Sequence, residues 1–171
     1  SRSTHQAIQG VEDYLRSGYE WIVEVDIEKF FDSVDRSILL DLVNEEITDG
    51  RVLRLIRSFL EAGVMEEAKV KHLLSGTPQG GVISPLLANI YLHPLDETML
   101  KEGFRIIRYA DDAAVLCRTK AEAEAALNKI KEVLEGKLKL RLNVEKTKIV
   151  HKTQGFEFLG YNFFGYETGK Y

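Results

Sequence analysis

Apolar residues recur along the chain with two different periods, and the change of period predicts the order of the secondary-structure elements. Helical spacing in residues 1–19 predicts a first helix. Residues 21–27, WIVEVDI, alternate from one face to the other and predict a strand that ends near Asp26. Helical spacing returns in residues 37–43 and 51–63, so two helices should follow that strand.

The second half of the chain predicts a strand hairpin between two helices. A Gly-rich turn runs into a helix over residues 76–93, and a capping pattern starts a further helix over residues 119–136. Short apolar runs predict the strands, at residues 105–110, 113–117, 147–150 and 156–165. This order indicates an α+β fold with a ferredoxin-like antiparallel sheet and helices packed on one face.

Composition narrows the class of protein. A chain of 171 residues with 44% hydrophobic and 29% charged residues is long enough to form one domain with a real core. No apolar run approaches the ~20 residues that a membrane helix needs. A single cysteine, Cys117, excludes an internal disulfide and fits a reducing cytosol, and the four histidines show no zinc-ligand spacing.

The charge balance argues against a stand-alone nucleic-acid binder. The net charge is −4, from 23 basic and 27 acidic residues, whereas such binders usually carry a basic footprint. The distribution is uneven, because residues 136–152 hold six basic side chains against Glu145 alone. This segment is either a basic binding face or an ordinary solvated surface.

Two adjacent carboxylates, Asp111 and Asp112, interrupt the apolar run of the predicted hairpin. If the strand that ends near Asp26 lies beside this hairpin, Asp26 and Asp111 converge at one edge of the sheet. A cation would relieve their mutual repulsion, and hard oxygen ligands of this kind suit Mg²⁺. Taken separately, the pair is equally an ordinary turn and Asp26 a cap for the next segment.

Five sequence blocks resemble those of reverse transcriptases and follow one another in that family's order. RYADDAAVLC resembles the YxDD block, and VDIEKFFDSVD resembles the first aspartate block. GTPQGGVISPLLANIYLHPLDE is similar to the Gln-Gly block of group II intron reverse transcriptases, and LRLNVEKTKIV and GFEFLGYNF resemble the two blocks that follow. The resemblance covers nearly the whole chain.

The resemblance implies an RNA-directed DNA polymerase of group II intron type, which adds deoxynucleotides to a primer 3′-OH by two-metal phosphoryl transfer. The fold would be a polymerase palm. Residues 1–171 would form a single palm domain in which residues 1–20 are the end of the fingers, with the upstream fingers and the downstream thumb and maturase regions absent. The chain by itself is expected to be inactive or weak.

The same resemblance implies the partners and the location. The partners would be an RNA template, a DNA or RNA primer and deoxynucleoside triphosphates, with intron RNA bound by the full-length protein and no membrane. The expected location is the bacterial cytoplasm.

The resemblance also assigns the catalytic residues. Asp26, Asp111 and Asp112 match the catalytic and metal-binding carboxylates, and the backbone carbonyl of Ile27 would complete a metal shell. The implied cofactor is a pair of Mg²⁺ ions, for which Mn²⁺ can substitute.

Substrate contacts follow at other matched positions. Phe31 would lie against the incoming sugar and exclude a 2′-OH, whereas the neighbouring Phe30 is expected in the core. Gln79 and Gly80 would contact the nucleotide or template base, and Lys146 would approach the triphosphate.

The primer strand would be held by the turn formed by Phe158, Leu159 and Gly160. The aromatic residues of this segment are equally compatible with core packing.

Three other functions are compatible with parts of this pattern. A nucleotide cyclase could share the palm topology, although the Gln-Gly block would have no purpose there. An RNA-binding maturase module that assists intron splicing, and a retron or defence-associated reverse transcriptase, would both share the palm blocks.

Overall fold

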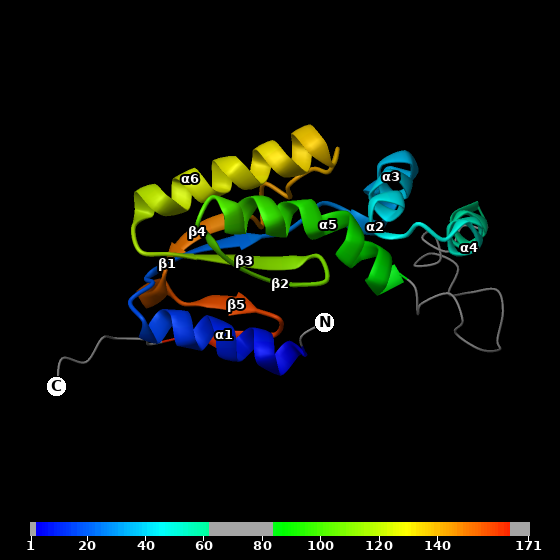
Figure 1. Ribbon diagram of the computed structural model, residues 1–171. Helices are drawn as coiled ribbons and strands as arrows, with labels where there is room; N and C mark the ends of the chain where they lie inside the picture. The colour runs from blue at the N-terminus through cyan, green and yellow to red at the C-terminus, as the bar shows by residue number, and fades with distance from the viewer. Residues whose placement is uncertain (1–2, 62–83, 165–171) are drawn as a thin grey trace.

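The computed structural model describes residues 3–61 and 84–164 (Figure 1). The predictions for Gln79 and Gly80 lie outside the described residues. The elements, in chain order, are α1 (Thr4–Arg16), β1 (Trp21–Val25), α2 (Phe30–Ser33), α3 (Arg36–Glu46), α4 (Gly50–Glu61), α5 (Ser84–Lys101), β2 (Arg105–Tyr109), β3 (Asp112–Cys117), α6 (Lys120–Lys131), the π-helical η1 (Glu132–Lys137), β4 (Lys148–His151), the 3₁₀-helical η2 (Lys152–Gln154), β5 (Phe156–Phe158) and β6 (Tyr161–Phe163).

Four strands form an antiparallel sheet in the order β2-β3-β1-β4. The strand β1 therefore lies between the hairpin strand β3 and the late strand β4. Its register with β3 runs from Trp21 opposite Cys117 to Val25 opposite Ala113. The predicted α+β fold with an antiparallel sheet is confirmed, and the end of β1 lies beside the start of β3.

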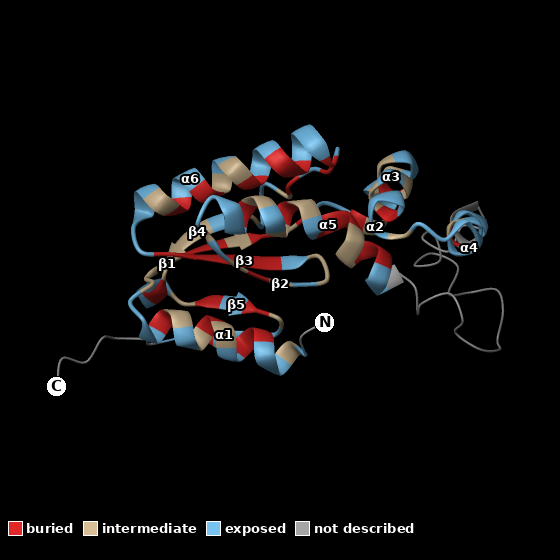
Figure 2. Ribbon diagram, in the orientation of Figure 1, coloured by how far each residue is buried: buried red, intermediate tan, exposed pale blue. Residues whose placement is uncertain are grey.

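Both faces of this sheet are covered. Helices α5 and α6 lie over one face, while α1 and the β5–β6 hairpin lie over the other (Figure 1). The expectation that helices pack on one face is therefore incomplete, because α1 lies on the opposite face. The reason is the apolar run of β3, in which residues 113–117 are all buried (Figure 2). A strand that is apolar on both sides needs a layer on each of them.

The larger core holds the sheet against α5 and α6. Val23 and Val25 of β1 point into it, as the predicted alternation requires, and Phe30 is only 2% exposed there. The core placement predicted for Phe30 is confirmed. The smaller core holds Ile22, the buried face of α1 and the phenylalanines of β5 and β6, with the rings of Phe156 and Phe163 stacked 4.7 Å apart.

Caps fix the ends of two helices as their sequences predict. The Asp35 carboxylate accepts hydrogen bonds from the N–H groups of Ser37 and Ile38 at 2.9 and 3.1 Å and so starts α3. Thr119 accepts a hydrogen bond from the N–H of Glu122 at 3.1 Å and starts α6. Among the helices of residues 3–61 and 84–164, none combines the length and the hydropathy required to cross a bilayer.

Candidate active site

The three predicted carboxylates meet at one edge of the sheet. Asp26 follows the last residue of β1 directly, and Asp112 immediately precedes Ala113, the partner of Val25. Asp111 lies in the turn between β2 and β3, which are paired up to Tyr109 opposite Asp112. Antiparallel pairing therefore brings together side chains that are more than 80 residues apart in the sequence.

The segment before β4 fixes the backbone of Asp26. The Thr147 hydroxyl accepts a hydrogen bond from the Asp26 N–H and donates one to the Asp26 carbonyl, both at 3.2 Å. The Asn143 N–H also donates to that carbonyl, at 2.9 Å. Because both backbone groups are held, the carboxylate leaves the sheet in a defined direction.

The backbone carbonyl of Ile27 faces the same edge. Ile27 lies opposite Leu142 in an isolated antiparallel bridge whose hydrogen bonds are made by residues 26 and 28, at 2.9 and 2.8 Å. In such a ladder the residue between the two bonds turns its own N–H and C=O to the other side. The Ile27 carbonyl therefore points away from Leu142, to the side of β1 on which β3 lies.

Burial and neighbouring negative charge both act on Asp112 where the carboxylates meet. Loss of hydration raises the pKa of Asp112, and the negative charges of Asp111 and Asp26 raise it further, whereas Lys146 opposes the rise. The Lys146 ammonium lies 3.4 Å from a carboxylate oxygen of Asp26. One exposed cation thus acts on both Asp26 and Asp112.

The carboxylates separate two open clefts. The first, here called the hairpin cleft, has a volume of about 610 Å³ and is lined by Asp26, Asp112 and Lys146 together with Phe158, Leu159 and Gly160. The structure therefore places the predicted primer-binding turn beside two of the predicted catalytic residues.

The second cleft, here called the α2 cleft, has a volume of about 540 Å³. Asp26, Ile27 and Asp111 line it together with Phe31 and Lys146. Phe31 is half-buried, and its ring meets that of Phe30 edge-on at 5.1 Å. Asp26 and Lys146 line both clefts, whereas Asp111 lines one and Asp112 the other.

The turn of the β5–β6 hairpin has a tight and specific geometry. Phe158 pairs with Tyr161, and the two residues between them, Leu159 and Gly160, have φ angles of 52° and 76°. Two successive residues with positive φ are typical of the type I′ turn that joins two-residue hairpins. The Phe158 ring is buried in the smaller core and anchors the turn there, whereas Gly160 is exposed and lines the hairpin cleft.

The structure adds a charged group that the sequence did not reveal. Glu24, Lys148 and Glu157 line the hairpin cleft, and the Lys148 ammonium lies 3.5 Å from one carboxylate oxygen of Glu24. The other oxygen of Glu24 is buried without a hydrogen-bond partner. Burial, and secondly Glu157, raise the pKa of Glu24, while Lys148 opposes the rise. The sequence contained one indication of this group: the alternation of β1 places Glu24 on the same face of the strand as Asp26.

The donor set fits a hard divalent cation. Within residues 3–61 and 84–164, no group of three histidine, cysteine or acidic side chains is placed so that it could hold a metal ion. Mg²⁺ does not require such a group, since it is commonly held by one or two carboxylates with water and substrate phosphates in the rest of its shell. Asp26, Asp111 and the Ile27 carbonyl offer oxygen ligands of this kind.

Two known proteins are similar in sequence to most of this chain. The chain is 35% identical to Protein YkfC of Escherichia coli (strain K12), over 94% of this chain and 52% of that protein. It is 30% identical to the Group II intron-encoded protein LtrA of Lactococcus lactis subsp. cremoris, over 94% of this chain and 37% of that protein. The chain thus spans about half the length of the first relative and just over a third of the second.

A solved structure shares the fold. Telomerase from Candida albicans, determined in complex with a fragment of telomeric RNA, superposes with a TM-score of 0.66 at 15% identity, over 94% of this chain and 32% of that one. The sequence profile described as "Reverse transcriptase (RNA-dependent DNA polymerase)" matches residues 1–163. The chain belongs to the reverse transcriptase family.

Proposed function

We propose that this chain is the palm of an RNA-directed DNA polymerase of group II intron type, which joins a deoxynucleotide to a primer 3′-OH. The observation that carries the proposal is the meeting of Asp26, Asp111 and Asp112 at one sheet edge, between two clefts that share Asp26 and Lys146. In-line phosphoryl transfer needs an attacking group on one side of the reacting phosphate and a leaving group on the other. Two clefts that meet at one set of carboxylates provide that arrangement.

The α2 cleft would bind the incoming nucleotide and the hairpin cleft would bind the primer. In the α2 cleft, Phe31 would lie against the sugar of the incoming deoxynucleotide and exclude a 2′-OH. In the hairpin cleft, the turn at Leu159 and Gly160 would support the primer strand with its 3′ end toward Asp112.

Lys146 would serve the leaving group. Its side chain is 68% exposed, and its only ion pair among the described residues is with Asp26, so it can turn toward a triphosphate without loss of packing. There it would stabilise the negative charge of the departing pyrophosphate or supply a proton to it.

The proposed reaction requires divalent cations at the carboxylates. Asp26, Asp111 and the Ile27 carbonyl would hold them, with Asp112 as an acidic neighbour, and we propose two Mg²⁺ ions for which Mn²⁺ can substitute. Once bound, the ions would neutralise phosphate charge and lower the pKa of the primer hydroxyl.

The partners follow from the reaction. They are an RNA template, a DNA or RNA primer and deoxynucleoside triphosphates. The similarity to an intron-encoded protein supports intron RNA as a further partner of the full-length protein. We propose the bacterial cytoplasm as its location.

Replacement of Asp111 tests the proposal. Asp111→Asn in the full-length protein removes a ligand charge and keeps the side-chain shape, so primer extension should fall by at least about 100-fold with an unchanged unfolding midpoint. Asp41→Asn, which alters an exposed carboxylate on α3, is the matched control and should extend normally. Near-normal extension by folded Asp111→Asn protein would refute the assignment.

A further inference from the structure

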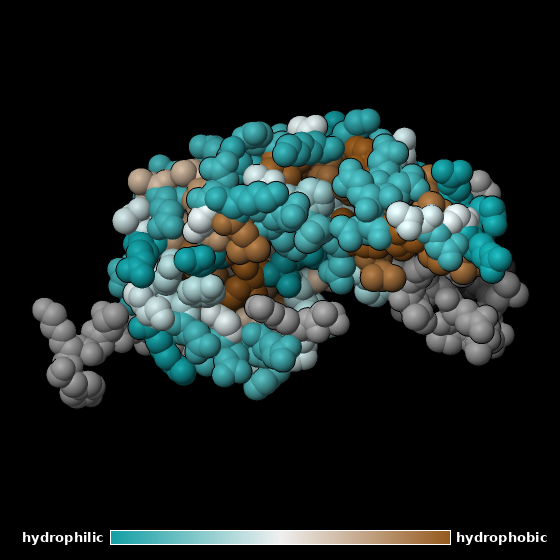
Figure 3. Space-filling view, in the orientation of Figure 1, coloured by the Kyte–Doolittle hydropathy of each residue, from teal (hydrophilic) through white to brown (hydrophobic). Residues whose placement is uncertain are grey.

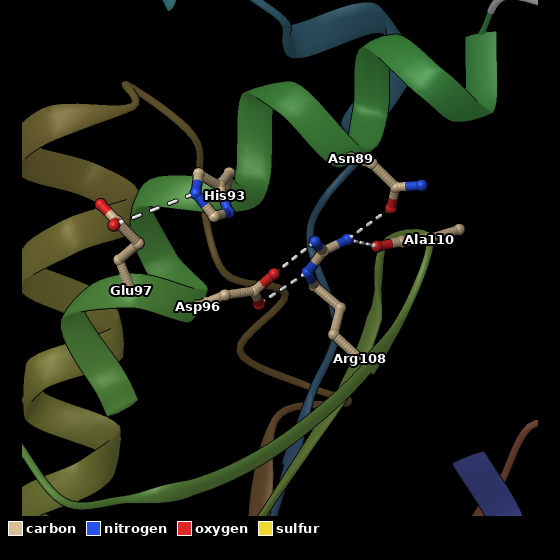
Figure 4. Close-up of polar contacts among 6 residues, drawn as sticks. All are labelled: Asn89, His93, Asp96, Glu97, Arg108 and Ala110. Carbon is tan, nitrogen blue, oxygen red and sulfur yellow. Dashed lines mark hydrogen bonds and ion pairs between the residues drawn. The ribbon is translucent and has the colours of Figure 1, made fainter. Parts of the chain in front are cut away.

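A buried arginine connects the turn that carries the carboxylates to helix α5. Arg108 is the fourth residue of β2, and its side chain is only 9% exposed. Its Nε and Nη2 atoms donate to the two carboxylate oxygens of Asp96 on α5, at 2.8 and 2.5 Å (Figure 4). This is the bidentate geometry in which a guanidinium binds a carboxylate most firmly.

The third nitrogen of Arg108 reaches the turn itself. Nη1 donates to the backbone carbonyl of Ala110 at 2.7 Å and to the side-chain oxygen of Asn89 at 3.0 Å (Figure 4). Asn89 and Asp96 are seven residues apart, or two turns, on one face of α5. The Arg108 guanidinium therefore binds two residues of α5, two turns apart, and one backbone carbonyl of the turn.

The hydrogen bond from Arg108 to Ala110 holds a residue whose backbone conformation is strained. Ala110 has φ = 56°, a left-handed conformation that costs energy for a residue with a Cβ. The next residue is Asp111, so the direction of its carboxylate depends on whether Ala110 keeps this conformation. Without the Arg108 bond, the turn could relax and turn Asp111 away from the edge.

The surroundings strengthen these bonds. A hollow between α1 and α5 has a volume of about 620 Å³. Apolar Leu100, Ile106 and Ile107 line it beside Arg108 and Asp96, and polar residues of α1 line it as well. Figure 3 shows apolar side chains gathered between the polar surfaces of these two helices. Because the Arg108 side chain itself is only 9% exposed, few water molecules compete for its hydrogen bonds, which are stronger than on an open surface.

We infer that Arg108 is a positioning residue for the polymerase site: it holds the Ala110 carbonyl and thereby sets Asp111 for metal binding. The inference rests on the proposed function. Arg108 lines neither the hairpin cleft nor the α2 cleft, and its effect passes through the turn. Lysine could not replace it, because a single ammonium lacks the planar fork that reaches Asp96, Asn89 and Ala110 together.

The test uses variants of β2 and α5 in this chain. Arg108→Gln removes all four bonds, Arg108→Lys keeps the charge, and Asp96→Asn spares the bond to Ala110. Ile107→Val is the matched control, since it lowers stability from the same strand through the smaller core without touching the turn.

Two measurements separate positioning from stability. Hydrogen exchange of the amides of residues 109–113 should become faster in Arg108→Gln and Arg108→Lys, and less so in Asp96→Asn, at matched overall stability. Mn²⁺ affinity, read from the free ion by electron paramagnetic resonance, should fall about tenfold in Arg108→Gln, as is usual when the support of a metal ligand is lost. Ile107→Val should change neither.

The outcomes distinguish the two claims. Turn amides and Mn²⁺ affinity that match those of Ile107→Val would overturn the positioning role while leaving the metal site in place. Failure of the unaltered chain to bind Mn²⁺ would count against the proposed function, and the exchange rates would still decide whether Arg108 holds the turn.

Discussion

The two clefts beside the carboxylates are similar in size but different in construction. The hairpin cleft is lined by residues of β1, β3 and β4 and by a tight hairpin turn, and it contains the charged group of Glu24, Lys148 and Glu157. The α2 cleft is lined by the loop after β1 and by the four-residue helix α2; Lys29, the last loop residue before α2, adopts a left-handed conformation with φ = 44°. One wall is a sheet and the other is a short helix and a loop.

The difference in construction matches the tasks that we propose for the two clefts. A primer strand moves through the site in each cycle, and a rigid sheet with a fixed turn gives it a constant path. A nucleotide enters and leaves in every cycle, and a wall made of loop residues can adjust around it. Asp26 and Lys146 line both clefts, so the reaction joins the two at these residues.

The largest effect should come from removing the shared carboxylate. Asp26→Asn should lower the rate of primer extension in the full-length protein by at least about 100-fold, whichever substrate is varied, because Asp26 serves both clefts. Residues that act as one unit are not additive, so combining Asp26→Asn with Asp111→Asn should cost little more than either change alone. Additive losses in single-turnover rates would show that the two carboxylates act separately.

A change confined to the α2 cleft should alter sugar selection. Phe31→Ala removes the ring that would collide with a 2′-OH, so the ratio of kcat/KM for deoxynucleotide over ribonucleotide should fall by roughly 10- to 100-fold. The affinity for primer should stay as it was, since Phe31 does not line the hairpin cleft. An unchanged sugar ratio in a folded variant would assign Phe31 to packing against Phe30.

A change confined to the hairpin cleft should alter primer binding and leave sugar selection as it was. Gly160 has φ = 76° and no atom near the position of an added Cβ, so Gly160→Ala strains the turn by about 1 kcal/mol without a clash. We expect the KM for primer–template to rise a few-fold while sugar selection is unchanged. Gly18→Ala, at φ = 85° and equally free of contacts, is the matched control for strain and should leave this KM alone.

The carboxylates at the sheet edge could be predicted from the sequence, whereas the side-chain bonds that support them could not. Alternation in WIVEVDI gave the two faces of β1, and the apolar runs beside Asp111 and Asp112 gave the hairpin, because strand periodicity is a local property. The side of the sheet that α1 covers was not predictable, since an amphipathic pattern shows that one face is buried but not against what. The bonds from Arg108 to Asp96 and from Lys146 to Asp26 join residues 12 and 120 positions apart, and only the tertiary fold brings them together.

The smallest expected effect concerns Cys117, at the end of β3 that lies far from both clefts. Burial raises the pKa of its thiol to about 12, so at pH 8 the reactive thiolate should be about a thousandfold rarer than for a thiol at the ordinary value of 9.0. Because this pKa is raised, the stability contribution of the protonated thiol is complete below pH 9 and is lost as the pH rises toward 12. Labelling of the native chain by iodoacetamide should therefore be very slow, and rapid labelling would contradict the burial of β3.

Because Cys117 is unreactive, a single cysteine in either cleft can be read by labelling once any reactive cysteines outside these 171 residues have been replaced. Asp32→Cys places an exposed thiol in the α2 cleft, and Glu157→Cys places one in the hairpin cleft. In the full-length protein, primer–template alone should slow the labelling of Glu157→Cys several-fold and leave Asp32→Cys unchanged. Adding the matching deoxynucleotide to a primer that lacks its 3′-OH should then slow the labelling of Asp32→Cys. The reverse pattern would exchange the tasks of the two clefts, because each thiol reports only the wall on which it lies.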